Sequence, residues 1–271
     1  MPSSVIAKNP AGARCVFTEE DHRYTWGDEN DPTDAVAHEL ISVSTLVHQF
    51  APPFDAEKVA QSIAARTGED PAAIVAKWDR NRDEACVRGT RTHETAEDCL
   101  LGRAPRHKPA DEEERHRFSA VWRFASGIKE KFNVLGVEKL VFSPTLGVAG
   151  TIDLLLERAG TVYIMDWKTN KDPSKAPSGT YEPPFSHLPN SALSAYALQL
   201  SMYRILLEVE DYTIIKKFGA GQLLWVHPKD EGDEWEVSPF AVPDMGREAA
   251  MMIALRSRTK WYSDWQKRMP F

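Results

Sequence analysis

The sequence of 271 residues lacks long apolar runs and has only three cysteines. The most apolar stretch, Ala192–Leu207, is interrupted by polar residues such as Arg204, so we expect no transmembrane helix. The number of cysteines is odd, and Cys15, Cys86 and Cys99 are widely spaced, which argues against a disulfide framework and against a zinc site. The first residues also lack the apolar segment of a secretory signal. We therefore expect a cytoplasmic protein that has no membrane partner.

Positive charge is also scarce. The chain has 33 Lys and Arg against 40 Asp and Glu, a formal net charge of −7. This balance disfavours a tight, non-specific coat on nucleic acid, because phosphate binding depends on lysine and arginine. It leaves room for a local binding groove, since a divalent metal would neutralise carboxylates in a site. The basic residues gather near the C-terminus, at Arg247, Arg256, Arg258, Lys260, Lys267 and Arg268.

The residue pattern predicts a single α/β domain with a mixed central β-sheet flanked by helices and a helical N-terminal portion. Residues 1–84 are expected to form a hairpin and a helical extension, and residues 85–271 the main α/β unit. Helices are predicted over 44–49, 55–66, 70–82 with helical spacing that continues through 84–101, 111–132, 190–210 and 244–267. Strands are predicted over 15–26 (as a hairpin), 137–142, 148–157, 161–168, 222–227 and 234–242.

Two aspartates in neighbouring predicted strands are the most informative feature. Gly160 predicts a tight turn, and a turn centred between Ala159 and Gly160 would place Asp153 directly opposite Asp166. Opposed residues have Cβ atoms about 5 Å apart, where two like charges are destabilising. Both aspartates also lie within apolar runs, where an unpaired charge is costly. A hard divalent cation such as Mg²⁺ would offset this cost.

Lys168 lies two residues beyond Asp166, so both side chains point to the same face of the strand. A metal beside them would polarise a phosphoryl oxygen, and the lysine would orient water or stabilise developing charge. The backbone carbonyl of Trp167 would be a further metal ligand, with its ring on the opposite face. An isolated Asp-x-Lys is usually an ordinary ion pair. The matched Asp153 across the hairpin favours a catalytic site instead.

Four segments in order resemble the PD-(D/E)XK nuclease superfamily, in particular its RecB-like exonuclease branch. Gly150-Thr-Ile-Asp153 resembles the family's G-x-x-D element, and Asp166-Trp-Lys168-Thr169 its D-x-K-T element, which phage and mitochondrial exonucleases also carry. Upstream, Arg88–His93 resembles the helix that bears the metal-binding histidine of this branch. Downstream, Gln199–Tyr203 matches the Q-x-x-x-Y element. The resemblance covers about Ala85 to Glu208.

This resemblance implies a restriction-endonuclease-like core over residues 85–271, within one nuclease domain. It implies an Mg²⁺- or Mn²⁺-dependent exonuclease that acts on DNA ends or single strands in recombination, repair or replication. A single-strand annealing protein, a single-strand binding protein or a helicase would be the partner. A structure-specific endonuclease and a non-catalytic DNA-binding module are the alternatives. The implied roles are catalytic for Asp153, Asp166 and Lys168, metal-binding for His93, Asp153, Asp166 and Trp167, and nucleic-acid-binding for Gln199, Tyr203 and Thr169.

Several of these residues also have ordinary interpretations. His93 in a charged helix could simply face solvent, and Gln199 and Tyr203 could interrupt a buried helix face. Glu138, at the start of a predicted strand, is either a surface charge or a carboxylate close to the metal. In the last predicted helix, aromatic residues alternate with cations, as in surfaces that stack bases. Their spacing fits a core stripe better, so Trp261, Tyr262 and Trp265 are not assigned to the site.

Overall fold

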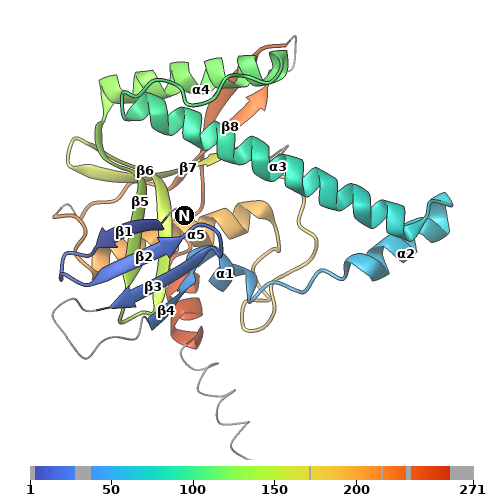
Figure 1. Cartoon of the computed structure of the whole chain (residues 1–271). Coiled ribbons are helices and arrows are strands. Elements are labelled where there is room, and N and C mark those ends of the chain that lie inside the picture. The colour runs from blue at the N-terminus through green and yellow to red at the C-terminus, as the bar shows by residue number, and fades with distance from the viewer. Residues whose placement is uncertain (1–3, 28–37, 171, 215, 230–232, 257–271) are drawn as a thin grey trace, which may run out of the picture.

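The computed structural model describes residues 4–27, 38–170, 172–214, 216–229 and 233–256 (Figure 1). Within these residues, nine strands form one sheet in the order β1-β2-β3-β4-β6-β7-β8-β9, with β5 paired to β6. Their bounds are β1 Ser4–Lys8, β2 Arg14–Thr18, β3 Arg23–Gly27, β4 His38–Ser42, β5 Asn133–Ser143, β6 Val148–Arg158, β7 Thr161–Lys168, β8 Gln222–Pro228 and β9 Trp235–Ala241.

The sheet is mixed, as predicted. β4 pairs parallel with β6, and β7 pairs parallel with β8, whereas the other neighbouring strands run antiparallel. The parallel pair β7–β8 requires a crossover, which contains helix α5 (Ala192–Val209). Helices flanking a mixed central sheet confirm the predicted fold class.

The hairpin β6–β7 has the predicted register. Its ladder runs from Arg158↔Thr161 to Leu154↔Met165, so the next opposed positions are 153 and 166. The two-residue turn requires positive φ at both central residues, and Ala159 (φ 49°) and Gly160 (φ 72°) adopt it. A short turn of this type fixes the register of the strands that it joins, and thereby the aspartates' positions.

Each further helix begins at a side chain that caps its first free backbone N–H groups. The helices are α1 Val43–His48, α2 Ala56–Thr67, α3 Pro71–Leu100 and α4 Glu112–Lys131, with N-caps Ser42, Asp55, Asp70 and Asp111. The start predicted at Ser44 was wrong, because β4 leads directly into the helix and the Ser42 hydroxyl accepts from Thr45 N–H at 3.0 Å. A last helix covers residues 246–256, where the description ends.

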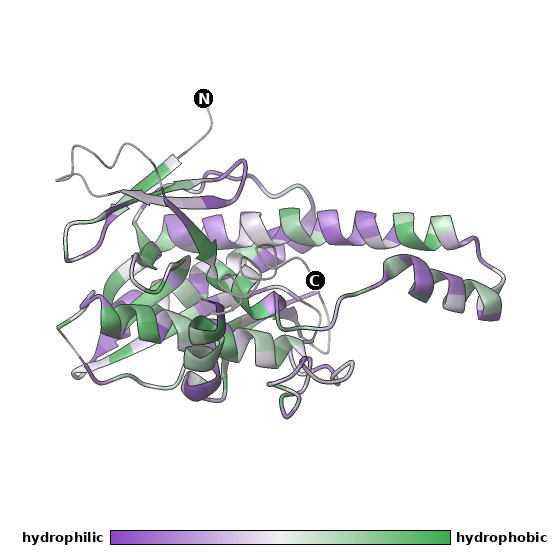
Figure 2. Cartoon of the chain, turned by 90° about the horizontal axis from the view of Figure 1, so that it is seen from below, coloured by the Kyte–Doolittle hydropathy of each residue, from purple (hydrophilic) through white to green (hydrophobic). Residues whose placement is uncertain are grey.

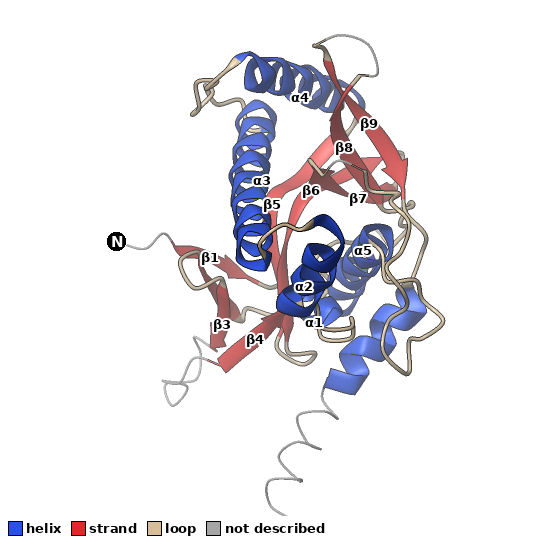
Figure 3. Ribbon diagram, turned by 90° about the vertical axis from the view of Figure 1, so that its right-hand side faces the viewer, coloured by secondary structure: helices blue, strands red, loops and turns tan. Residues whose placement is uncertain are grey.

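Helices cover the sheet on both sides (Figure 3), and an apolar cluster lies between the helices and the sheet on each side. On one side, α1, α5 and the last helix pack on it through residues such as Leu46, Leu206 and Met252. On the other side, α3 and α4 pack on it through residues such as Cys99 and Val121. The sheet is therefore buried on both faces in its centre, and polar residues there need partners. Among the described residues, no helix is both long and apolar enough to span a membrane.

The N-terminal part contains more strand than predicted. β2 and β3 form the expected hairpin over Cys15–Trp26, but β1 and β4 pair on its two edges, which makes an antiparallel meander of four strands. The pairing of β4 with β6 (Ile41↔Val148) joins this meander to the central sheet. That contact spans about a hundred residues of sequence, which local patterns do not reveal.

The helix α3 is continuous over Pro71–Leu100, which confirms that the helical spacing predicted from residue 70 continues to about residue 101. Asp83 alone does not interrupt a helix, and Gly89 remains helical within it. The expected division between residues 84 and 85 lies within this helix. Its first half projects from the body together with α2, as an arm of two antiparallel helices (Figures 1 and 2). The second half packs on the sheet and on α4.

Candidate active site

Three adjacent strands bring three acidic residues into a row. The pairs Val137↔Leu154 and Lys139↔Ile152 bracket Glu138 and Asp153, so Glu138 on β5 lies across from Asp153 on β6. Asp166 follows on β7. Asp153 is 9% exposed and Asp166 is 2% exposed. Burial therefore raises the pKa of both carboxyl groups, to about 6 for Asp166.

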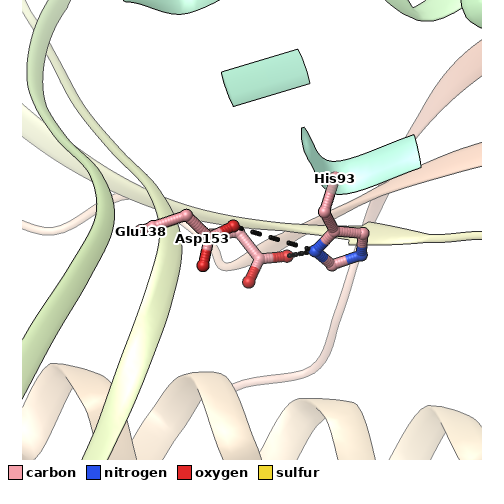
Figure 4. Close-up of side chains that lie close together, drawn as sticks. All are labelled: His93, Glu138 and Asp153. Atoms are coloured by element: carbon pink, nitrogen blue, oxygen red, sulfur yellow. Dashed lines mark ion pairs between the residues drawn. The ribbon is translucent and has the colours of Figure 1, made fainter. Parts of the chain in front are cut away.

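His93 reaches this row from α3 (Figure 4). Its Nδ1 lies 3.3 Å from Asp153 Oδ2 and 3.9 Å from Glu138 Oε1. Its Nε2 lies 3.0 Å from the carbonyl oxygen of Trp167. One donor atom each from His93, Glu138 and Asp153 lie within 4.8 Å of one another. The imidazole is thus oriented by a backbone carbonyl on one side and faces two carboxylates on the other.

The surroundings of His93 favour its charged form. Burial opposes the charge, but the neighbouring Asp153 and Glu138 outweigh it and raise the pKa of His93 to about 9. A raised pKa contributes stability that is present below pH about 6.5 and is lost as the pH rises through about 9. In EDTA, we expect the free energy of unfolding to fall by up to about 3 kcal/mol over this interval, as measured by urea denaturation.

In His93→Gln the free energy of unfolding should no longer fall between pH about 6.5 and 9. The control His187→Gln removes an exposed imidazole outside the cluster and should show the same fall as wild type. An equal pH dependence in His93→Gln and wild type would contradict the assignment. A metal ion bound to His93 requires the neutral imidazole, so metal binding should release a proton below pH 9.

Asp166 is held by two polar side chains. Lys168 makes an ion pair with its Oδ2, and Gln199 Nε2 donates to its Oδ1 at 3.2 Å. The Lys168 ammonium also lies 4.6 Å from the centre of the Tyr196 ring. Burial opposes its charge, but Asp166 and Asp153 more than compensate and hold the pKa of Lys168 above its usual range. Lys168 therefore remains charged at neutral pH.

Tyr203 explains the glycine of the Gly150-Thr-Ile-Asp153 segment. Gln199 also donates to Tyr203 Oη at 3.2 Å, and the Tyr203 ring packs directly on Gly150. A Cβ atom at position 150 would lie 2.6 Å from Tyr203 Cε1, which is shorter than any ordinary contact. Only glycine allows Tyr203 to lie there and, through Gln199, to support Asp166.

We expect Gly150→Ala to lower the free energy of unfolding by about 1–3 kcal/mol, because the buried Tyr203 ring has to move. Urea denaturation measures this change. The matched control is Gly127→Ala in α4, where an added Cβ meets nothing within 4 Å. It should raise stability by up to about 1 kcal/mol, because alanine is the better helix former. Equal effects of the two substitutions would refute the packing argument.

The position of His93 depends on charged contacts between α3, α4 and the segment that joins them. Arg91 binds Glu114 through two hydrogen bonds of 2.7 and 2.8 Å. Hydrogen bonding to Arg91 lowers the pKa of Glu114 to about 2. Two turns further along α3, the buried Asp98 accepts hydrogen bonds from the Arg106 guanidinium at 2.7 and 3.0 Å. These pairs flank His93 on the same helix and fix the helix above the carboxylates.

The donor atoms gathered here suit a hard divalent cation. Carboxylate and carbonyl oxygens are the ligands of Mg²⁺ and Mn²⁺, and imidazole is compatible with Mn²⁺. Asp166 Oδ2 is buried and, apart from its ion pair with Lys168, accepts no hydrogen bond. Asp153 Oδ2 accepts from Trp167 N–H at 2.8 Å, which orients the carboxylate towards His93. The residues present fit a metal ion.

The structure brings most of the predicted residues together, but the group of possible metal ligands differs from the predicted one. The compact group of possible metal ligands contains Glu138 in addition to His93 and Asp153, while Asp166 faces Lys168 and Gln199. The sequence left Glu138 undecided, because a lone glutamate at a strand start carries little information. The metal-binding roles of Asp166 and of the Trp167 carbonyl remain predictions.

Two other predictions have different outcomes. Thr169 lies just beyond β7 and lines a separate hollow together with Arg88 and Asn170; its role remains a prediction. Trp261, Tyr262 and Trp265 lie outside the residues that the structure describes.

A mixed sheet between helices, with two aspartates and a lysine on one β-hairpin, is an arrangement that suits a metal-dependent nuclease. The family model of the PD-(D/E)XK nuclease superfamily matches residues 31–269, and the chain belongs to this superfamily. The match confirms the superfamily expected from the motifs and does not specify a branch. It also agrees with the restriction-endonuclease-like fold. No curated protein sequence matches the chain.

Proposed function

We propose that the chain is a DNA exonuclease that hydrolyses phosphodiester bonds with Mg²⁺ or Mn²⁺. The observation that carries the proposal is the row of Glu138, Asp153 and Asp166, with His93 above it and Lys168 beside it. Superfamily membership supports a nuclease that uses a divalent metal. A carboxylate-pair glycosidase would need no lysine in this place.

In this proposal each side chain has a separate task. His93, Asp153 and Glu138 hold the metal, with Asp166 and the Trp167 carbonyl beside them. When bound, the metal polarises a phosphoryl oxygen and lowers the pKa of a water molecule. Asp166 positions the Lys168 ammonium, which orients the attacking water or stabilises charge on the phosphate. Gln199 holds Asp166 in place, and Tyr203 holds Gln199.

The surroundings of the cluster favour a substrate that enters by an end. His93, Glu138, Gln199 and Tyr203 line a cleft of about 630 Å³, which also has walls from β1–β3 and α3. A flexible strand with a free end enters such a space more easily than the middle of a duplex. The resemblance to RecB-like exonucleases supports the same preference. It also supports a role in recombination, repair or replication, beside a single-strand annealing protein, a single-strand binding protein or a helicase.

The test compares linear and circular DNA, single- and double-stranded, in Mg²⁺, Mn²⁺ and EDTA. We expect cleavage of linear DNA in either metal and none in EDTA, with products released progressively from a labelled end. Circular single-stranded DNA should survive. Rapid nicking of the circles would indicate an endonuclease. Binding of DNA without cleavage of any substrate in either metal would favour a non-catalytic module.

A further inference from the structure

The cleft that contains the cluster has two walls of different character. One wall carries polar side chains, including His93, Glu94, Glu97 and Glu138. The other wall comes from the N-terminal meander, where Val5, Phe17 and Tyr24 form an apolar and aromatic patch beside Glu19 and His22. Its volume of about 630 Å³ is in the usual range for sites that enclose a small ligand, about 300–1,000 Å³. A nucleotide also has a polar end and an apolar end, namely a charged phosphate and a flat, largely apolar base.

The apolar wall is built by strand register. Val5 on β1 pairs with Phe17 on β2, and Phe17 pairs with Tyr24 on β3, so the three side chains form a row across the meander. The Phe17 and Tyr24 rings are stacked with centroids 4.5 Å apart, and His22 meets the edge of Phe17 at 5.1 Å. Tyr24 is buried, Phe17 is half-buried, and Val5 is 43% exposed. The row thus runs from the core to solvent.

A hydrogen-bonding contact ties this wall to the catalytic strand. Tyr24 Oη lies 3.4 Å from Thr151 Oγ1, and Thr151 is two residues before Asp153 on β6. The aromatic row therefore has a fixed position relative to the carboxylates. A base held against the row would place its own phosphate at a defined place in the cleft.

Cations are scarce in this cleft. Among the described residues that line it, Arg106 is the one arginine or lysine, and its guanidinium already binds Asp98 and Glu97. Phosphate contacts with basic side chains therefore contribute little to substrate binding here. Affinity has to come from the metal ion and from contacts with the base.

We propose that the row Val5–Phe17–Tyr24 is a nucleobase subsite that makes the enzyme select unpaired DNA. The inference rests on the proposed nuclease function and adds the substrate class. A base within a duplex has both faces covered by its neighbours, so only an unstacked base can lie against Phe17. Stacking on an aromatic side chain accepts any of the bases, so the subsite gives no strong sequence preference.

The test replaces the ring and removes the base in the same experiment. Single-stranded oligonucleotides with one abasic position, moved stepwise along the strand, are cleaved by wild type and by Phe17→Ala. In wild type we expect one position near the cut bond where loss of the base raises KM about tenfold, with kcat nearly unchanged. Phe17→Ala should show the raised KM with intact DNA and no further change at that abasic position.

Two variants serve as controls for folding. Phe17→Trp keeps an aromatic surface and should retain a KM close to that of wild type. Val16→Ala changes the adjacent residue on the opposite face of β2 and should leave the abasic response unchanged. An abasic response in Phe17→Ala equal to that in wild type would overturn the subsite while the nuclease function stands. If wild type cleaves no DNA, both proposals fail.

Salt dependence gives an independent measurement on the same protein. A site with few phosphate contacts should lose less than about tenfold in kcat/KM on short single strands between 50 and 200 mM salt. A loss of about a thousandfold or more would point to an extensive basic surface, and would overturn the claim that the base provides the main contact.

Discussion

Lys168→Met should reduce kcat on linear single-stranded DNA by at least about 100-fold, the usual loss when one charged group that stabilises the transition state is removed. Methionine retains an unbranched side chain one atom shorter than lysine and removes the ammonium that Asp166 holds. Because this ammonium acts on the reacting phosphate rather than on distant parts of the strand, KM should change much less than kcat. Single-turnover cleavage with saturating enzyme measures the chemical step.

A double variant separates catalysis from folding. Removing Lys168 alone leaves the buried Asp166 without its ion-pair partner, which lowers stability. In Asp166→Asn/Lys168→Met no uncompensated charge remains, so the fold should recover stability while activity stays lost. Lys139→Met is the matched control and should remain active, because Lys139 lies on β5, separated from β7 by β6, with its ammonium 5.9 Å from the centre of the Tyr212 ring. If Lys168→Met retained full kcat, the lysine's assigned task would be wrong.

Asp153→Asn should weaken Mn²⁺ binding by at least about 100-fold. Loss of a group that merely orients a ligand costs about 10- to 100-fold in metal affinity, and loss of a ligand itself costs more. Asp153 is the central carboxylate, with its Oδ2 directed at His93 and held by Trp167 N–H. Asparagine has the same shape but supplies a neutral oxygen, so the charge that attracts the cation is lost. Isothermal titration of the metal-free protein measures the affinity without requiring activity.

The matched control for that titration lies on the same strand. Glu157→Gln also replaces a carboxylate by an amide, but Glu157 binds the hairpin turn through Gly160 N–H and lies away from the cluster. It should bind Mn²⁺ as wild type does. Glu138→Gln should weaken Mn²⁺ binding, but less than Asp153→Asn does, because the Glu138 side chain is more exposed than those of the other members of the cluster. Equal affinities of Asp153→Asn and Glu157→Gln would mean that the metal binds elsewhere.

The hairpin that carries the aspartates could be predicted from sequence because its determinants are local. A two-residue turn at Ala159 and Gly160 fixes the register by backbone geometry, and the apolar residues around Asp153 and Asp166 indicate buried strands. The side chain of Lys168 follows from strand alternation. For the same reason, the helix starts predicted at residues 55, 70 and 111 agree to one residue with the helices that Asp55, Asp70 and Asp111 cap.

The positions of Glu138, His93 and the meander could not be predicted, because they depend on contacts between segments that are distant in the sequence. Glu138 joins the cluster because β5 pairs with β6 and because its backbone has a φ of 46°, an unusual value that no sequence pattern announces. His93 lies above the carboxylates because α3 packs on the sheet and because the Arg91–Glu114 pair joins it to α4. The meander lies beside the active site because β4 pairs with β6. The helices α2 and α3 lie between these two strands in the sequence, so no local pattern predicts the pairing.

Anomalous diffraction from crystals soaked in Mn²⁺ would show whether a divalent metal ion binds beside Lys168 on the β6–β7 hairpin. We expect a strong anomalous peak within ordinary coordination distance, about 2.0–2.3 Å, of an Asp153 oxygen and of a His93 nitrogen. The peak should be absent in crystals of Asp153→Asn. A fully soaked wild-type crystal with no manganese at this cluster, or with manganese bound only elsewhere, would mean that the cluster is not a metal site.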